Sequence, residues 1–313
     1  MKKALILLFT LALALSAQVA MKQDAGNITV TIDGKPFTTF YTGGDAPKPY
    51  LHPLLTADGE RITRLFPMEK ADGETRDHPH HRGLWYTHGD VNGVDFWMNE
   101  KGQTKGRRGI IDTEKISKVK GGRKEGTIEA SFIWKAPEGE SLLRESRVMV
   151  FHADPKLRIV DFDVTFTALA DSVKFGDTKE GFFAIRLRDE MMQRKGGTLV
   201  NANGGKGMRE VWGKASPWND YHNTLNGKVV GVAILDHPSN PKHPTYWHSR
   251  DYGLFAANAL GERDYYNDKT RDGSLTIKKG EKLRFRYRVV IHPGATGEAG
   301  IANLFADYAR NVK

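Results

Sequence analysis

Imidazole side chains are concentrated in one short segment of the chain. Four of the 11 histidines lie between His78 and His88, in the run Asp-His-Pro-His-His-Arg-Gly-Leu-Trp-Tyr-Thr-His that begins at residue 77. Imidazole has the unperturbed pKa nearest to neutral pH, so histidine suits proton transfer, and it is also the commonest metal ligand. The segment therefore predicts a working surface, and we expect His80, His81 and His88 to perform acid–base chemistry.

The neighbouring residues are of kinds that bind sugars. Arg82 could pair with an anionic group, Asp95 offers a carboxylate, and Trp85 and Trp97 could stack on the apolar face of a pyranose ring. This combination predicts a metal-free polar cleft in which these four residues orient the substrate. The plain alternative is a loop held by histidine–backbone hydrogen bonds, with the tryptophans in the core.

A metal site is a second alternative. In an extended chain His78 and His80 point to the same side, whereas His81 faces the other way. With His88 or a carboxylate completing the shell, the pair could chelate a divalent metal. A His-x-His pair alone is a weak signal, and no motif in the chain requires a cofactor.

A second histidine-rich segment spans residues 217–250. We expect this segment and residues 67–107 to form long connections, which are usually functional in compact domains. If both cover the same face, His248 joins the catalytic groups, and His237 and Trp247 help to bind the substrate. Taken singly, each of these histidines fits a structural role better.

Glu180 is the candidate general base. It precedes the apolar segment 181–186, and a carboxylate at the mouth of such a strand could accept a proton. An ordinary solvated turn residue is an equally good interpretation.

The elements that must position these residues are strands. Apolar and polar residues alternate with a period of two in residues 27–33, 127–134, 157–166 and 283–291. Further strands are expected at 147–152, 181–187, 229–235, 253–259 and 273–277. Apolar residues at i, i+3, i+4 and i+7 in residues 301–308 predict a helix that packs on the outside of a sheet. The sequence thus predicts an all-β fold: a large antiparallel β-sandwich with long loops over one face and a C-terminal α-helix.

The N-terminal residues read as an export signal. Lys2 and Lys3 precede an uncharged apolar run at 4–15, and the small residues Ser16 and Ala17 follow. This run is too short for a bilayer-spanning helix, so residues 1–17 are expected to be a signal peptide cleaved between positions 16 and 20. An uncleaved anchor or a buried helix is the alternative. We expect an exported, periplasmic or extracellular protein, with residues 18–313 forming a single domain.

Composition removes several classes of function. The chain has no cysteine, so disulfides and thiolate chemistry are excluded. The net charge of +9 comes from scattered lysines and arginines, which does not resemble a nucleic-acid platform. No G-x-S-x-G elbow, Walker loop or H-E-x-x-H helix occurs, and the mature chain offers no membrane span. The expected partner is a small molecule or an oligosaccharide, and oligomeric state stays open.

Several of these motifs resemble the PmoA-like family of exported bacterial proteins. They are residues 48–54, 77–85, 88–97 and 288–292, with Glu180-Gly-Phe-Phe and Asp236-His-Pro. The resemblance implies a secreted β-sandwich associated with carbohydrate breakdown. The label "methane oxygenase PmoA", often given to such proteins, implies a membrane copper monooxygenase subunit, which this chain contradicts because its mature part has no transmembrane helices.

The architecture is also similar to galactose mutarotase-like supersandwiches, although no mutarotase histidine or glutamate can be matched by motif. Together these signals predict an exported carbohydrate-processing protein that acts on a sugar, oxidised sugar or glycoside, as a lyase, hydrolase or isomerase. The alternatives are a metal-dependent hydrolase, lyase or oxygenase that uses the His78–His88 loop, and a non-catalytic glycan-binding module.

Overall fold

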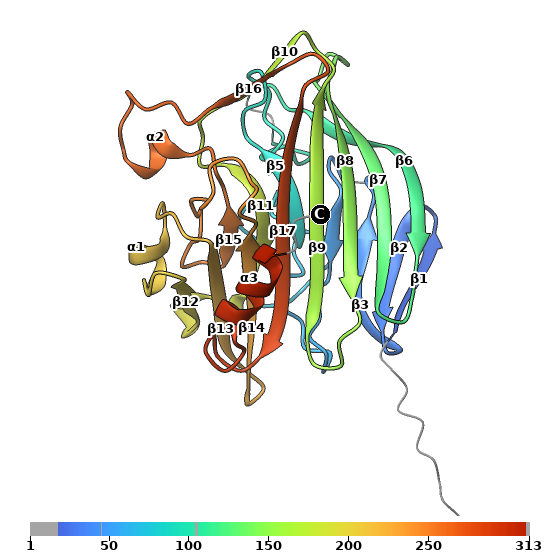
Figure 1. Ribbon diagram of the computed structural model, residues 1–313, viewed down its shortest axis with the longest axis vertical. Coiled ribbons are helices and arrows are strands. Elements are labelled where there is room, and N and C mark those ends of the chain that lie inside the picture. Colours follow the sequence, from blue (N-terminus) through green and yellow to red (C-terminus); the bar gives the residue numbers. More distant parts are fainter. Residues whose placement is uncertain (1–17, 45, 104–105, 311–313) are drawn as a thin grey trace, which may run out of the picture.

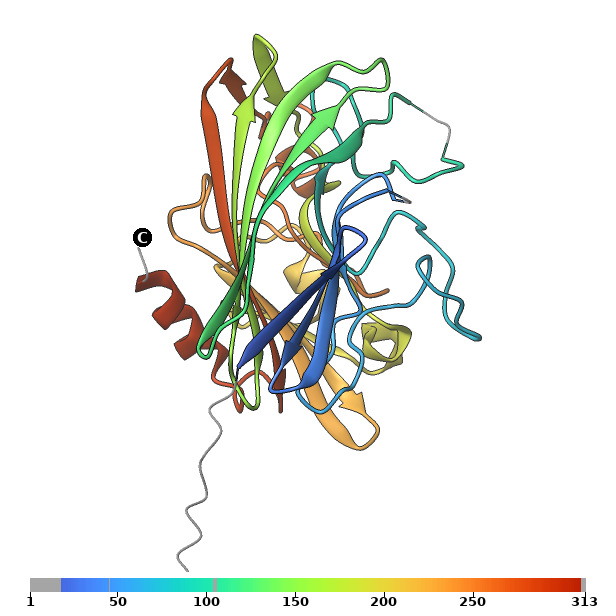
Figure 2. The ribbon, with the colours of Figure 1, turned by 90° about the vertical axis from the view of Figure 1, so that its right-hand side faces the viewer.

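The computed structural model describes residues 18–44, 46–103 and 106–310 (Figure 1). The predicted signal segment, residues 1–17, lies outside the described residues. Two large antiparallel sheets stand face to face, as the two views show (Figures 1 and 2). Among the described residues, no helix combines the length and the apolar character needed to cross a membrane.

One sheet has seven strands in the described part of the chain, in the order β1-β2-β3-β4-β5-β11-β15. These strands are β1 (Val19–Asp24), β2 (Asn27–Ile32), β3 (Lys35–Tyr41), β4 (Tyr50–His52), β5 (Leu84–His88), β11 (Gly181–Arg186) and β15 (Leu254–Ala257). Strands far apart in sequence therefore meet in the middle of this sheet, where β5 pairs with β4 and β11.

The other sheet has eight described strands, in the order β12-β13-β14-β17-β9-β8-β7-β6. They are β6 (Ile110–Lys120), β7 (Glu125–Lys135), β8 (Ser141–His152), β9 (Arg158–Ala168), β12 (Thr198–Asn201), β13 (Trp218–Leu225), β14 (Lys228–Asp236) and β17 (Lys282–Pro293). A separate two-stranded antiparallel sheet pairs β10 (Ser172–Phe175) with β16 (Leu275–Lys278). The short helices are η1 (Asp189–Met191), η2 (Gln193–Lys195), α1 (Gly207–Val211) and α2 (Glu262–Tyr265).

The inner faces of the two sheets share one apolar core. Phe183 of β11 stacks on Tyr287 of β17 with ring centroids 4.8 Å apart, and Phe37 of β3 meets Phe151 of β8 edge to face at 6.0 Å. These rings come from alternate positions of their strands, as the period of two requires. The predicted antiparallel sandwich is confirmed.

The core also contains a buried ion pair. Glu145 and Arg147 of β8 face inward, and Arg147 Nε donates to Glu145 Oε1 at 2.6 Å. Trp134 Nε1 donates to the other carboxylate oxygen at 2.9 Å, and the guanidinium lies 5.0 Å from the Phe132 ring centroid. Hydrogen bonds and ring contact together compensate for the loss of water around both charges.

The predicted C-terminal helix is α3 (Ile301–Arg310). Its apolar side, with Ile301 and Tyr308, packs on Ala233, Leu235 and Val290, which point outward from the eight-stranded sheet (Figure 1). The helix therefore covers the outside of a sheet, as its apolar stripe predicts.

Both expected connections contain strands. Residues 67–107 include β5 (Leu84–His88), in the middle of the seven-stranded sheet. Residues 217–250 contain all of β13 and β14, so only the part after Asp236 is a connection. The polar residues of β13 obscured the strand, because Asn219 and Asp220 are buried within the sheet. Asp220 is satisfied there by His292, whose Nε2 lies 2.9 Å from its Oδ1.

Candidate functional site

The candidate site lies on the outer face of the seven-stranded sheet, meaning the surface turned away from the eight-stranded sheet. One row of paired residues crosses this face: Tyr41 opposite Tyr50, Tyr50 opposite Trp85, Trp85 opposite Ala184, and Ala184 opposite Ala256. Four of them, from Tyr50 to Ala256, belong to an apolar cluster separate from the main core. The two alanines carry only methyl groups, so larger side chains on either side dominate the row.

Stacked rings rise from this row. His81 stacks on Trp85 at a centroid distance of 5.2 Å, His78 stacks on His81 at 4.8 Å, and Tyr252 stacks on His78 at 5.1 Å. Trp97 leans on Trp85 at 5.1 Å. His80 meets His81 edge to face at 4.5 Å. We call His78, His80, His81, Trp85, Trp97 and Tyr252 the histidine–tryptophan cluster.

Gly83 lets the histidine segment lie against the sheet. Its φ is +48°, and a Cβ added there would lie 2.1 Å from the Leu51 carbonyl oxygen and 3.1 Å from the His52 Cβ. Both neighbours belong to β4, so the glycine is required by a close backbone approach as well as by its dihedral angle. This explains the glycine of the His-His-Arg-Gly sequence.

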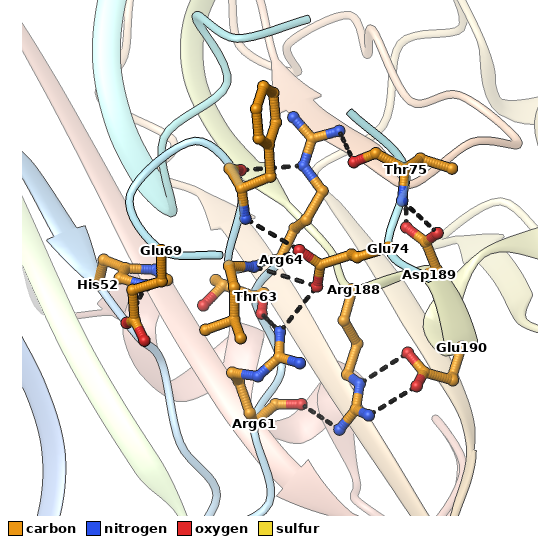
Figure 3. Close-up of polar contacts among 12 residues, drawn as sticks. His52, Arg61, Thr63, Arg64, Glu69, Glu74, Thr75, Arg188, Asp189 and Glu190 are labelled. Atoms are coloured by element: carbon orange, nitrogen blue, oxygen red, sulfur yellow. Dashed lines mark hydrogen bonds and ion pairs between the residues drawn. The ribbon is translucent and has the colours of Figure 1, made fainter. Parts of the chain in front are cut away.

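Polar contacts hold the loop that leads into the cluster (Figure 3). The Glu74 carboxylate accepts hydrogen bonds from the backbone N–H groups of Leu65 and Phe66 at 2.8 and 2.9 Å. Asp189 accepts from the Thr75 backbone N–H at 2.8 Å and from its hydroxyl at 2.9 Å. The loop is thereby tied down just before Asp77.

Asp77 organises two arginines. Arg64 and Arg186, both fully buried, donate to its Oδ1, the latter at 2.6 Å, and His78 Nδ1 lies 2.9 Å from its Oδ2. Burial alone would raise the pKa of Asp77, but the His78 contact and the two arginine charges hold it well below its usual range. Two guanidinium charges therefore share one carboxylate.

The tautomer of His81 follows from its partner. Arg186 Nη1 lies 3.2 Å from His81 Nδ1, and a guanidinium can only donate. Nδ1 is therefore the acceptor, and the ring proton is on Nε2. Burial, reinforced by the charges of His80 and Arg186, holds the pKa of His81 well below its ordinary value, so the ring is neutral.

His80 has the same tautomer. Gln103 Oε1 accepts from the Glu100 backbone N–H at 3.0 Å, which fixes the amide orientation, and Gln103 Nε2 then donates to His80 Nδ1 at 3.0 Å. Burial, followed by the charge of Lys48, lowers the pKa of His80 to about 2. His80 and His81 are thus neutral hydrogen-bond donors through Nε2.

This arrangement differs from that of a metal site. A metal-ligating histidine normally donates its other ring N–H to a carboxylate or carbonyl. His78 Nδ1 does lie near the Asp77 carboxylate, but the Nδ1 atom of His80 faces a donor, Gln103. His88 does not join His78 and His80, because it lies on the inner side of the sheet. No group of three or more potential metal ligands occurs within the described residues.

His248 flanks the same face. Its backbone N–H donates to the Ala256 carbonyl at 2.9 Å, which sets it beside the end of the alanine row. Its Nδ1 lies 2.7 Å from the Lys179 carbonyl oxygen, so Nδ1 carries the proton and Nε2 has a lone pair. Burial lowers the pKa of His248 to about 3.

Glu180 follows Lys179, whose carbonyl accepts the hydrogen bond from His248. Burial raises the pKa of Glu180 above its ordinary value; Lys179, whose Nζ is 3.6 Å away, lowers it, and Asp95 raises it. The charge of Glu180 also contributes to the raised pKa of Tyr252, behind burial and against Arg250 and Arg186. The carboxylate is therefore electrostatically coupled to the histidine–tryptophan cluster.

Residues 27–306 match a model described as a family of unknown function, DUF6807. The chain belongs to this family. The DUF6807 match includes the whole histidine–tryptophan cluster together with Glu180 and His248. The model does not bear the PmoA-like name, so that resemblance stays a prediction. No curated protein matches the chain.

Several solved structures are distantly similar to this DUF6807 chain. The GH36 α-galactosidase AgaA from Geobacillus stearothermophilus has a TM-score of 0.41 and 10% identity, over 88% of this chain and 40% of that one. A galactose mutarotase-like protein from Lactobacillus casei ATCC 334 has a TM-score of 0.40 and 9% identity, over 88% and 100%. Galactose 1-epimerase from Lactobacillus acidophilus NCFM has a TM-score of 0.35 and 8% identity, over 90% and 100%. The chain spans about two fifths of the α-galactosidase, and likenesses this low carry no inference about the site.

Arg82 and Asp95 lie beside the cluster with partners of their own. Arg82 donates twice to Glu100, both at 2.7 Å, and its guanidinium lies 5.3 Å from the Tyr50 ring centroid. Asp95 Oδ1 accepts from the backbone N–H groups of Trp97 and Met98 at 2.8 Å. These contacts pack around Trp85 and Trp97, which are fully buried, so neither indole face is open to a sugar in this structure.

Three predicted site residues lie elsewhere. His88 is on the inner side of β5, where Nε2 donates to the Gly176 carbonyl at 2.8 Å. Trp247 also points inward, stacks on Phe255, and donates to the Ser216 carbonyl at 2.9 Å. His237 contacts Tyr308 of α3 at 5.1 Å, on the eight-stranded sheet. The structure does not bring these three to the cluster.

Sequence reasoning missed Tyr252, Arg186, Arg250 and Gln103. Arg186 and Arg250 had a recoverable signal, because each is two residues from a position on the outer face, Ala184 and His248 respectively. Tyr252 and Gln103 lie in a turn and a loop, where no periodicity sets the side-chain direction.

Proposed function

We propose that this chain binds and processes a sugar, oxidised sugar or glycoside on the outer face of its seven-stranded sheet. The observation that carries the proposal is the pair of neutral histidines with fixed Nε2–H donors, set among stacked aromatic rings. Sugars have apolar C–H faces and polar hydroxyl edges, so aromatic planes beside directed donors suit them.

Glu180 is the proposed acid–base residue. A carboxyl group transfers protons most effectively when its pKa lies near the working pH, and burial raises the pKa of Glu180. His248 Nε2, with a free lone pair, would accept a hydrogen bond from a substrate hydroxyl.

His80 and His81 take a different role from the proton transfer expected of them. A ring with a pKa of about 2, such as His80, is a poor proton carrier near neutral pH. A neutral imidazole can nevertheless polarise a substrate oxygen through its N–H without being protonated. We assign these two residues to hydrogen bonding of the substrate, and we propose that the protein acts after export.

The test measures binding and turnover separately across neutral and oxidised sugars and glycosides. Glu180→Gln should leave binding within a few-fold of wild type and reduce turnover by about 10²–10⁴-fold, the usual loss on removing a general acid or base. Glu138→Gln is the matched control, because Glu138 pairs with Arg107 at an exposed site and should change neither quantity. Unchanged turnover in Glu180→Gln would remove this residue from the mechanism.

His81 provides the second arm. His81→Ala should weaken saccharide binding by about tenfold, the loss expected for one buried hydrogen bond. The control is His152→Ala, which removes a histidine paired with Asp161 on the other sheet. Saccharide binding without turnover of any substrate would instead indicate a non-catalytic glycan-binding module.

A further inference from the structure

Arg250 is an additional residue on the outer face. Its backbone N–H donates to the Leu254 carbonyl at 2.7 Å, and the His248 N–H donates to the Ala256 carbonyl at 2.9 Å. His248 therefore lies opposite Ala256 of β15, and Arg250 lies opposite Leu254. Both side chains project to the same side of the sheet as Leu254 and Ala256. Leu254 and Ala256 belong to the apolar cluster that contains Trp85 and Trp97.

The guanidinium of Arg250 has aromatic neighbours but no acidic one. Its Cζ lies 5.9 Å from the Trp212 ring centroid and 5.7 Å from that of Tyr252. No carboxylate of residues 18–44, 46–103 or 106–310 lies within ion-pair distance of it. Its Nε is buried and has no hydrogen-bond partner among those residues. A charged donor held in this way lacks an anionic acceptor.

The surroundings of Tyr252 contain more positive than negative charge. The Arg186 Cζ lies 4.9 Å from the Tyr252 ring centroid, and Arg186 is fully buried with an unpartnered Nε. Its carboxylate partner, Asp77, is shared with Arg64. Two arginines therefore divide one negative charge, while Arg250 has none.

We infer that the natural ligand is an acidic saccharide whose carboxylate, as in a uronic acid, is bound by Arg250 beside Tyr252. The inference rests on the proposed function and narrows its substrate class. A guanidinium presents donors in a planar fork that matches the two oxygens of a carboxylate. A guanidinium fork also binds phosphate-type oxyanions, so a sulfated saccharide serves as the rival anionic ligand in the experiment.

The experiment compares affinities by isothermal titration calorimetry. The probes are glucuronate and galacturonate with short oligomers of each, the matching neutral glucose and galactose compounds, and a sulfated galactose oligomer. The variants are Arg250→Gln, Arg250→Lys, and Arg123→Gln as a control for net charge, because Arg123 is exposed on the β6–β7 hairpin. Thermal unfolding of each variant checks that it is folded.

The wild type should bind at least one uronate about tenfold or more tightly than its neutral counterpart, as a charge-assisted hydrogen bond requires. Arg250→Gln should abolish this preference and leave neutral binding intact, Arg250→Lys should keep part of it, and Arg123→Gln should keep all of it. Three results would overturn this inference while leaving the proposed function standing. They are equal affinity for charged and neutral sugars, tighter binding of the sulfated oligomer than of any uronate, and an equal loss of uronate and neutral-sugar affinity in a folded Arg250→Gln variant. If no saccharide binds at all, the inference and the proposed function both fail.

Discussion

Replacing Gly83 with alanine should displace the histidine segment from the sheet. The added Cβ would lie 2.1 Å from the Leu51 carbonyl oxygen, far inside normal contact, and the obstructing atom belongs to the backbone of β4. A flexible side chain could move away, but this carbonyl cannot move without separating β4 from β5. The segment carrying His81 and Arg82 must therefore shift instead.

The cost has two parts. An alanine held at a positive φ costs about 1–2 kcal/mol. Forcing an extra carbon into a closely packed site adds about 1–3 kcal/mol. Gly83→Ala should therefore lower the free energy of unfolding by about 2–5 kcal/mol, by adding these two contributions. Gly73→Ala is the matched control, because Gly73 has a φ of +76° and nothing within 4 Å of its added Cβ.

Urea denaturation followed by tryptophan fluorescence measures both variants. Gly73→Ala should show only the dihedral part, and Gly83→Ala should show both, with similar m values so that the midpoints are comparable. Saccharide affinity should fall in Gly83→Ala alone, because His81 would leave its stack on Trp85. Equal destabilisation of the two variants would refute the assigned close approach of Gly83 to β4.

Other consequences follow from the buried charges. Glu145→Gln should cost about 3–5 kcal/mol in urea denaturation because it leaves Arg147 buried without its carboxylate. Glu145→Leu combined with Arg147→Met should cost less, about 1–3 kcal/mol, because only the Trp134 indole N–H then loses its acceptor. A single variant that loses under about 1 kcal/mol would contradict the buried pair. Asp77→Asn should lower the free energy of unfolding by about 1–2 kcal/mol, a modest loss because Asp77 is 40% exposed and solvent weakens its ion pairs. The same variant should also weaken ligand binding. Unchanged stability and unchanged binding would count against the organising role of Asp77. Acid should destabilise the protein from about pH 6 downward. Five described histidines have folded pKa values below the unfolded value of about 6.5. As the pH falls below that value, each histidine therefore removes up to about 1.4 kcal/mol of folding stability per pH unit. Asp77, whose pKa is also lower in the folded protein, removes further stability below about pH 4. A free energy of unfolding that stays flat between pH 6 and pH 4.5 would contradict those pKa directions.

Much of the fold was predictable because burial on one side of a strand leaves a visible period. Residues 157–166 alternate cleanly, and in β9 they place Val160, Phe162, Val164 and Phe166 in the core, as expected. β13 was missed because its buried positions include the polar residues Asn219 and Asp220, and the partner that satisfies Asp220, His292, is too distant in sequence to leave a local signal.

The site was only partly predictable, because alternate residues of a strand point to opposite faces of the sheet and the sequence does not show which face is which. The histidine segment and His248 do lie by the outer face, but His88 is an odd number of residues from Trp85 and points inward. Trp247 and His248 are likewise neighbours on opposite sides of their strand. Such assignments need the register of each strand, which depends on pairings across the sheet. The tautomers of His80 and His81 depend on Gln103 and Arg186, which are distant in sequence.

The outer face of the eight-stranded sheet is the natural rival location for a binding site, and its chemistry argues against it. There Arg288 donates twice to Asp161, at 2.5 and 2.7 Å, and Arg144 donates twice to Glu114, at 2.8 and 2.7 Å. Such fork-to-fork pairs satisfy both partners, and α3 covers part of the same surface. On the seven-stranded sheet, by contrast, the indole N–H groups of Trp85 and Trp97 are buried without an acceptor in the described chain. A buried polar group without a partner costs stability, so the unpaired indole N–H groups of these two residues favour this face as the one that a ligand completes.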